Sequence, residues 1–379
     1  MTTAAADAAP DTRSVVSPRR RDGLRRLPFL VPGGVALLAG LDAALMLLGL
    51  PAPVSAARLP DVHGMLLVLG FVGTLISLER AVALGHRAGY LAPGLLGAGA
   101  VLLVSPAPLP LARAALLAGT VALVGVYVPL WRRQRDDAVL VQALGAVLAT
   151  GAATLWLADV AVPTLLPWLV GFVVLTIAGE RLELARIAMG PGAGRTLVLL
   201  SAALVVTVTA SLLWPALGTP TVGLGLVVLV AWLATHDVAR RTVRSRGLVR
   251  FMAASMLAGY FWLAVAGAVW AVGGPAAEGV RYDAVVHAVF LGFTLSMVMA
   301  HAPVILPAVL RRPMPYHPVM LVPAAVLHAS LALRLWVGDA LGVPLAWQVG
   351  GALNIASLLG FVAVVAWSVT RSDRTGSRR

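Results

Sequence analysis

Long apolar runs constrain this chain more than any other feature of its sequence. Each run is about 20 residues long, enough to cross the hydrocarbon core of a bilayer as a helix. Only 12% of the residues are charged, about half the usual share for a soluble domain, and the mean hydropathy is +0.92. We therefore predict an all-α polytopic membrane protein, with one transmembrane domain over residues 30–370. The scan predicts twelve transmembrane helices, near residues 30–50, 61–84, 89–106, 110–131, 138–159, 163–187, 195–215, 220–240, 248–273, 281–306, 316–338 and 344–370.

Arginine clusters separate these runs in alternation. All 29 basic residues are arginine, and the formal net charge is +13. The arginines lie in short segments between apolar runs and not on one basic face, which argues against nucleic acid as a partner. The clusters "SPRRRDGLRR", "WRRQRDD", "RRTVRSRGLVR", "RRP" and "TRSDRTGSRR" fall at both ends and at alternate loops. By the positive-inside rule, both termini are expected in the cytoplasm of a bacterial inner membrane. Residues 1–29 are predicted to form a disordered basic cytoplasmic tail, and residues 371–379 a second tail.

Three of the predicted spans contain related segments. "GFVGTLISLER" (70–80) matches "GFVVLTIAGER" (171–181) at an offset of 101, and "GFTLSMVMAHA" (292–302) matches more weakly at an offset of 222. His301 then falls where Glu79 and Glu180 fall. Because these segments lie on spans 2, 6 and 10, the repeat predicts three units of four helices. Chance similarity is the alternative, since Gly-Phe is common in membrane helices.

Two histidines lie at a similar depth in spans 2 and 10. The chain has no cysteine, so it can form neither an iron–sulfur cluster nor a covalent c-type heme. His63 is expected at the outer end of span 2, and His287 about one turn inside the outer end of span 10. Two neutral imidazoles at one depth suit the axial positions of a non-covalent heme b. Asp283 lies four residues before His287 and is expected to accept a hydrogen bond from its other ring nitrogen. The alternative is two histidines that bond only to backbone carbonyls.

The segments "VHGMLLVLGF" and "VVHAVFLGF", together with three units of four helices, resemble subunit I of the heme-copper oxidases. In size the chain is more similar to the NnrS family of heme- and copper-containing membrane proteins, which is associated with nitric oxide and denitrification. The resemblance implies an inner-membrane heme protein in which His63 and His287 bind a low-spin heme. It also implies nitric oxide, or a related small diatomic molecule, as a ligand.

The chain departs from the oxidase pattern around the second metal site. Spans 6 and 7 contain no histidine, and Val285 and Val289 occupy the positions two residues from His287. An enzyme of this kind would be a membrane oxidoreductase without a conventional three-histidine copper site. His328, His301 and His317 are the remaining candidates to bind copper or a second heme, with His328 beside Met297 or Met299. A purely structural role is the alternative for these histidines.

Acidic and basic side chains also recur inside the predicted spans. Glu79-Arg80 and Glu180-Arg181 are repeated, and Glu183 and Arg186 follow on the same helix face. Charge compensation within the bundle is the simpler interpretation, and a proton pathway is the other. Two further functions therefore stay open: a twelve-helix transporter, and a non-catalytic accessory protein for metalloenzyme assembly. Nothing in the sequence indicates the electron donor.

Overall fold

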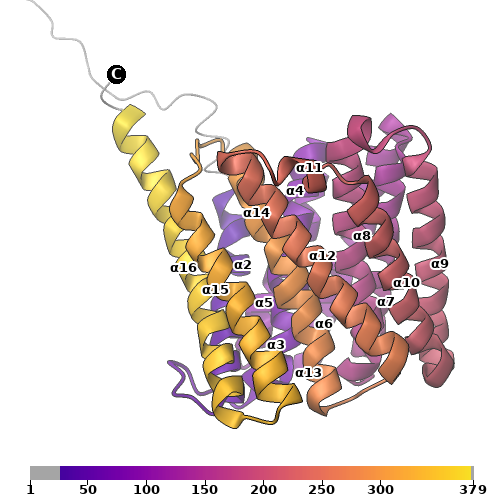
Figure 1. The fold of residues 1–379 in the computed structure, drawn as a ribbon, viewed down its shortest axis with the longest axis vertical. Coiled ribbons are helices and arrows are strands. Elements are labelled where there is room, and N and C mark those ends of the chain that lie inside the picture. Colours follow the sequence, from indigo (N-terminus) through magenta and orange to yellow (C-terminus); the bar gives the residue numbers. More distant parts are fainter. Residues whose placement is uncertain (1–25, 377–379) are drawn as a thin grey trace, which may run out of the picture.

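The structure, a computed structural model that describes residues 26–376, is a bundle of helices that run in alternating directions (Figure 1). Within these residues, twelve helical spans are long and apolar enough to cross a membrane, as the sequence predicts. The spans, numbered 1 to 12, are Leu27–Leu47, Arg58–Leu84, Arg87–Val104, Leu109–Gln134, Asp137–Leu157, Val162–Met189, Ala193–Leu213, Pro215–His236, Gly247–Gly273, Gly279–Leu310, Pro318–Ala340 and Pro344–Arg371. The protein is therefore a multi-pass membrane protein.

Most spans are single helices, and four contain shorter elements. The single helices are α2 (Leu27–Leu47), α6 (Leu109–Gln134), α7 (Asp137–Leu157), α8 (Val162–Met189), α9 (Ala193–Leu213), α10 (Pro215–His236), α12 (Gly247–Gly273) and α16 (Pro344–Gly376). Span 2 joins α3 (Arg58–Met65), η1 (Leu66–Gly73) and α4 (Thr74–Leu84), and span 3 joins η2 (Arg87–Tyr90) and α5 (Leu91–Val104). Span 10 joins α13 (Gly279–His287), η3 (Ala288–Leu295) and α14 (Ser296–Leu310). Span 11 joins η4 (Pro318–Met320), α15 (Leu321–Ala332) and η5 (Leu333–Ala340), and the short α11 (Ala239–Thr242) precedes span 9.

The ends of the transmembrane domain differ slightly from the predicted boundaries. Helix α2 begins at Leu27, three residues before the predicted start, with Pro28 in its first turn. Proline is favoured there because its missing N–H would have no partner within the helix. Helix α16 continues to Gly376, beyond the predicted end at residue 370. The predicted disorder of residues 1–25 and 377–379 lies outside the described residues.

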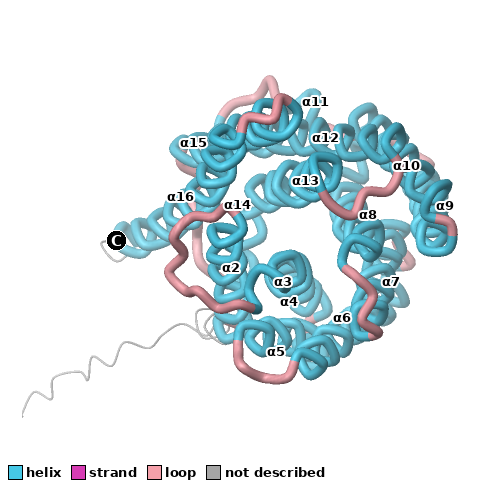
Figure 2. The backbone as a smooth tube through the Cα atoms, turned by 90° about the horizontal axis from the view of Figure 1, so that it is seen from below, coloured by secondary structure: helices cyan, strands magenta, loops and turns pink. Residues whose placement is uncertain are grey.

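Spans 2, 6 and 10 form the interior of the bundle. Between 67% and 78% of an apolar 18-residue stretch of each is buried, whereas the corresponding values of the other nine spans range from 28% to 56%. Figure 2 shows α3 and α4 inside the ring of helices, with α8 and α13 lying inward of their neighbours. These are the three spans that carry the repeated segments, each the second span of a predicted four-helix unit. The burial pattern thus agrees with three units around a common centre.

The repeated glycines have a packing reason. A Cβ atom on Gly70, Gly171 or Gly292 would lie within 3.0 Å of a side chain on a neighbouring span. Gly171 meets Leu148 of span 5, and Gly292 meets Trp262 of span 9, each at 2.4 Å. A glycine at each position lets the inner helix approach its neighbour closely, as small residues do at membrane helix interfaces.

The inner spans 2 and 10 both contain a wider, π-helical stretch just after their histidine. It covers Leu66–Gly73 in span 2 and Ala288–Leu295 in span 10. In the second, the Thr294 hydroxyl donates to the Val289 carbonyl, five residues earlier. Such wide turns are rare and often occur at functional sites. They place unusual helix geometry next to His63 and His287.

Candidate functional site

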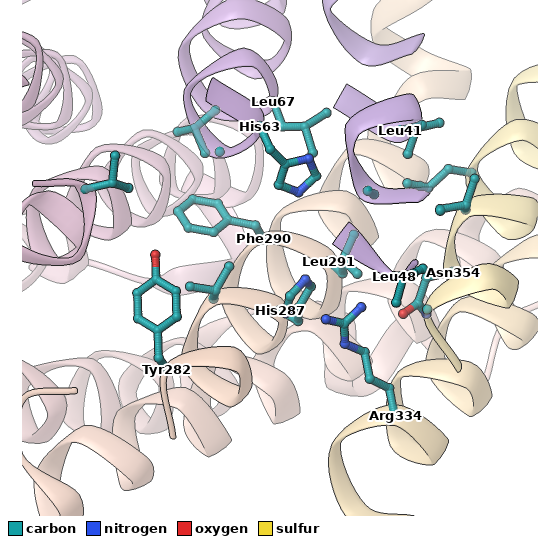
Figure 3. Close-up of a pocket in the computed structure, with 18 of the residues that line it drawn as sticks. Leu41, Leu48, His63, Leu67, Tyr282, His287, Phe290, Leu291, Arg334 and Asn354 are labelled. Atoms are coloured by element: carbon teal, nitrogen blue, oxygen red, sulfur yellow. The ribbon is translucent and has the colours of Figure 1, made fainter. Parts of the chain in front are cut away.

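A pocket in the core of the bundle contains both histidines predicted to form a pair. His63 and His287 line it together with Tyr282, Arg334 and Asn354, and the rest of its wall is mainly leucine, valine and phenylalanine. Figure 3 shows the two imidazole rings pointing into the same space from opposite helices. Helices α3 and α13, which carry the two histidines, lie at the end of the bundle away from residue 376 (Figure 1). We call this pocket the histidine pocket.

His63 is held by a backbone carbonyl of span 1. Its Nδ1 atom lies 2.8 Å from the carbonyl oxygen of Gly40. A carbonyl oxygen only accepts, so Nδ1 carries the proton and donates it. In a neutral imidazole the other nitrogen, Nε2, is then unprotonated. A Cβ atom at position 40 would lie 2.5 Å from Leu67, which shows how closely spans 1 and 2 approach here.

His287 is held in the same way from within span 10. Its Nδ1 atom lies 3.0 Å from the Asp283 carbonyl oxygen and 3.2 Å from the Asp283 carboxylate atom Oδ1. The four-residue spacing predicted this contact with Asp283, and the contact is present. Both acceptors require a proton on Nδ1, so Nε2 is again the unprotonated nitrogen.

Arg334 anchors the Asp283 carboxylate from span 11. Its Nε and Nη2 atoms donate to the two carboxylate oxygens at 2.9 and 2.8 Å, and its guanidinium lies 5.0 Å above the ring of Trp347. Bidentate pairing of this kind fixes the orientation of a carboxylate. The chain Arg334–Asp283–His287 therefore orients one imidazole of the pair.

The chemistry of these donors fits a heme iron. Two imidazoles with protonated Nδ1 and free Nε2 atoms are the form in which histidine binds a metal, and the bond at Nδ1 sets the ring orientation. The cavity itself has a volume of about 90 Å³. A porphyrin would therefore require side chains at its edge, such as Leu67, Phe290 and Leu291, to adopt other rotamers. The two histidine nitrogens therefore fit a heme iron, whereas the side chains around the pocket have to move to admit the porphyrin.

The three histidines predicted for a second metal site have separate partners. His301 has both ring nitrogens engaged, with Nδ1 at 2.8 Å from the Met297 carbonyl oxygen and Nε2 at 3.1 Å from Arg181 Nη1. His328 accepts at Nδ1 from the Trp262 indole N–H at 3.0 Å. His317 accepts at Nδ1 from the Val319 backbone N–H.

These bonds leave the three histidines poorly suited to bind a metal. Since Nδ1 of His328 and of His317 is an acceptor, the proton of the neutral ring lies on Nε2. Neither ring then presents the free Nε2 atom that His63 and His287 present. Within residues 26–376, no group of three or more His, Asp or Glu side chains is arranged to hold a metal ion. The predicted contact of His328 with Met297 or Met299 is not among the hydrogen bonds and ring contacts of His328.

The repeated Glu-Arg pairs form cross-helix bonds. Arg80 donates to Glu79 at 2.5 Å, to Glu183 of span 6 at 2.9 Å and to Gln142 of span 5 at 3.0 Å. Arg186 binds Asp136 at 2.8 Å and not a glutamate of its own helix. The predicted charge compensation is therefore present for Glu79 and Glu183, through Arg80, whereas Arg186 pairs with another span and not with Glu180 or Glu183.

The second arginine of the repeat binds a buried carboxylate. Arg181 donates from Nε and Nη2 to the two oxygens of Asp237 at 2.8 and 3.0 Å. Asp237 also accepts from the Tyr260 hydroxyl at 2.7 Å. Burial alone would raise the pKa of Asp237, but the bonds from Arg181 and Tyr260 hold that pKa below its ordinary value. Together with the bond between Arg181 and His301, these contacts tie spans 6, 9 and 10 to the segment after span 8.

Sequence reasoning missed the residues that orient the site. Arg334 interrupts the apolar run of span 11, and an arginine inside a span by default marks a functional partner. That signal was available. The roles of Gly40 and Trp262 depend on contacts between distant spans, and residue type alone carries no trace of such contacts.

A family model described as "Domain of unknown function (DUF8744)" matches residues 26–370, which is nearly the whole chain and the whole transmembrane domain. No curated protein and no solved structure matches the chain.

Proposed function

We propose that this chain, which belongs to the DUF8744 family, is a membrane heme protein in which His63 and His287 are the axial ligands of a heme b. One observation carries the proposal. Two inner helices bring two imidazoles into one pocket, and a bond at Nδ1 leaves Nε2 free in both rings. The resemblance to the heme-copper oxidases and the NnrS family supports the same pair of ligands.

The surrounding residues would bind and tune the group. His63 and His287 would hold the iron, and Asp283 would increase the electron density of the His287 ring through the Nδ1 bond. Leucine and phenylalanine side chains would exclude water from the porphyrin faces. A heme with two imidazole ligands supplies a one-electron iron couple when bound.

The two filled axial positions bear on nitric oxide. If His63 and His287 both bind iron, a diatomic ligand has to displace one of them. His63 has one carbonyl acceptor, whereas His287 is held by a carbonyl and by the Asp283–Arg334 pair. We therefore propose electron transfer as the primary role. Nitric oxide binding, which the resemblance implies, would require the release of His63.

Location in a bacterial inner membrane is part of the proposal. The described arginine clusters lie in the loops after spans 4, 8 and 10, at the end of the bundle where residues 26 and 376 lie (Figure 1). The positive-inside rule then assigns that side to the cytoplasm and the histidine pocket to the outer half of the bilayer.

The absorption spectrum of the purified full-length protein tests the proposal. We expect a Soret band, a sharp α-band on reduction and a pyridine hemochrome spectrum of heme b. His63→Ala and His287→Ala should each abolish the low-spin spectrum, because each removes one axial ligand. His236→Ala is the matched control, since His236 is exposed and stacks on Trp232 away from the pocket. A colourless protein, or an unchanged spectrum in both pocket variants, would support two histidines that bond only to carbonyls.

A further inference from the structure

A second cavity, of about 270 Å³, lies on the side of the bundle that carries residues 26 and 376. Its walls are largely apolar and include Phe71, Met297 and Phe361. Three ionisable side chains interrupt these walls: Glu79, Glu180 and His301. We call it the carboxylate cavity. On span 2 the two cavities are one helical turn apart, because Leu67 lines the histidine pocket and Phe71 lines the carboxylate cavity.

The three ionisable residues are the ones that the repeat aligns. Glu180 follows Glu79 at the offset of 101, and His301 follows it at the offset of 222. Equivalent positions of the three inner spans thus converge on one cavity. In sequence alone the repeat could be a chance similarity. The convergence of its aligned residues on one cavity gives the repeat a geometric basis.

The charges around the cavity leave one carboxylate unmatched. Arg80 pairs with Glu79 and Glu183, and Arg181 pairs with Asp237. Among the residues that the structure describes, Glu180 has neither a hydrogen bond nor an ion pair to another side chain. Four carboxylates, of which only Glu79 and Glu180 line the cavity, therefore share two guanidinium groups. An ionised carboxylate in an apolar cavity is costly without a positive partner, and such a residue marks a functional site by default.

The cavity opens sideways between spans 1, 10 and 12. Val362 at its edge is 47% exposed, and Leu30, Leu306 and Val365 are partly exposed. All four residues lie inside membrane-crossing spans. The opening therefore faces the region of the lipid chains and not a loop.

We propose that the carboxylate cavity binds an organic cation with an apolar body, which enters from the bilayer and places its positive charge near Glu180. The apolar walls favour such a body, and the rings of Phe71 and Phe361 suit a quaternary ammonium group. The excess carboxylates disfavour an anionic head group. Ligand pockets commonly have volumes of about 300–1,000 Å³. A volume of about 270 Å³ suits a head group whose chain leaves through the opening.

Equilibrium binding of radiolabelled dodecyltrimethylammonium to the full-length protein, immobilised in nanodiscs, tests this proposal. Dodecanol, which is neutral and has the same chain, is the matched ligand, and empty nanodiscs give the background. We expect saturable binding of the cation and at least tenfold weaker binding to Glu180→Gln. Glu278→Gln is the carboxylate control, because Glu278 is exposed in the segment before span 10 and does not line the cavity.

A second pair of variants tests the opening. Val362→Trp should block the cation, whereas Leu353→Trp, at a similarly exposed position of the same helix, should not. Equal binding of dodecanol and the cation, with no effect of Glu180→Gln, would identify a pocket for lipid chains and overturn the proposal. Absence of saturable binding would overturn it as well. Neither readout involves heme, so the result is independent of the proposed function of the histidine pocket.

Discussion

The substitution Asp283→Asn tests whether the Arg334–Asp283–His287 chain both stabilises the fold and tunes the pocket. Asparagine keeps an acceptor for His287 and removes the counter-ion of Arg334. Breaking a buried ion pair costs about 3–5 kcal/mol, because the remaining charge stays buried without a partner. Here the two side chains are 21% and 9% exposed, so some water reaches the pair and the lower end of that range applies.

We expect a loss of about 3 kcal/mol and, at about 2 °C per kcal/mol for a chain of this size, a Tm about 6 °C lower. The assay is thermal unfolding of the heme-free protein in detergent, followed by the fluorescence of its ten tryptophans. The double variant Asp283→Asn/Arg334→Met should recover most of the loss, because it removes the stranded charge as well. Asp61→Asn, at an exposed position of span 2, is the control.

Heme affinity separates tuning from stability. Removing an outer partner of a metal-binding histidine lowers metal affinity about 10–100-fold. Heme titration of the single and the double variant should therefore show a similar loss of affinity, although their Tm values differ. A double variant that melts as low as the single one would refute the account of Arg334. Heme affinity within twofold of the wild type in both variants would refute the role of Asp283.

Three further predictions follow from other parts of the fold. Arg181 holds the pKa of Asp237 in the folded protein below the ordinary value of 3.8, so this pair stabilises the protein above pH 3.8 and loses its contribution as the pH falls through the folded pKa. Acid should therefore lower the Tm of the wild type more than that of Asp237→Asn. Gly292→Ala should cost about 1–3 kcal/mol in thermal unfolding, since its Cβ would lie 2.4 Å from Trp262, whereas Gly125→Ala, which meets nothing within 4 Å, should be neutral or stabilising. Topology reporters fused after residues 135, 245 and 379 should read cytoplasmic and those after 55, 161 and 276 external, and one clear reversal would contradict the assigned orientation.

The helix count could be predicted from sequence, because apolar length depends on local residue type, and the repeated segments marked three spans that the structure places inside the bundle. The pairing of His63 with His287 followed from depth alone, since antiparallel spans share a membrane of fixed thickness. Depth in the membrane was not enough to predict a second metal site. Whether His301 or His328 offers a free nitrogen depends on which donor packs against it, and Arg181 and Trp262 come from other spans. Lateral packing of this kind leaves little trace in one sequence.

The repeat accounts for the residues of the carboxylate cavity better than for those of the histidine pocket. At an offset of 101, Asp136 and Asp237 each accept from the backbone N–H two residues later, so the match extends beyond the inner spans to loop structure. Leu166 is the counterpart of His287 by the same offsets and lines the same pocket. By the same offsets, however, the counterparts of His63 are Thr164 and Val285, and the counterpart of His287 on span 2 is Met65, so the two histidines of the pocket are not equivalent positions. Equivalent positions meet in the carboxylate cavity, whereas the histidine pair departs from the repeat. Span 6 contributes Leu166 and Leu169 to the histidine pocket, which gives an apolar wall beside the two imidazoles. Such a wall suits the proposed flat apolar group held from two sides.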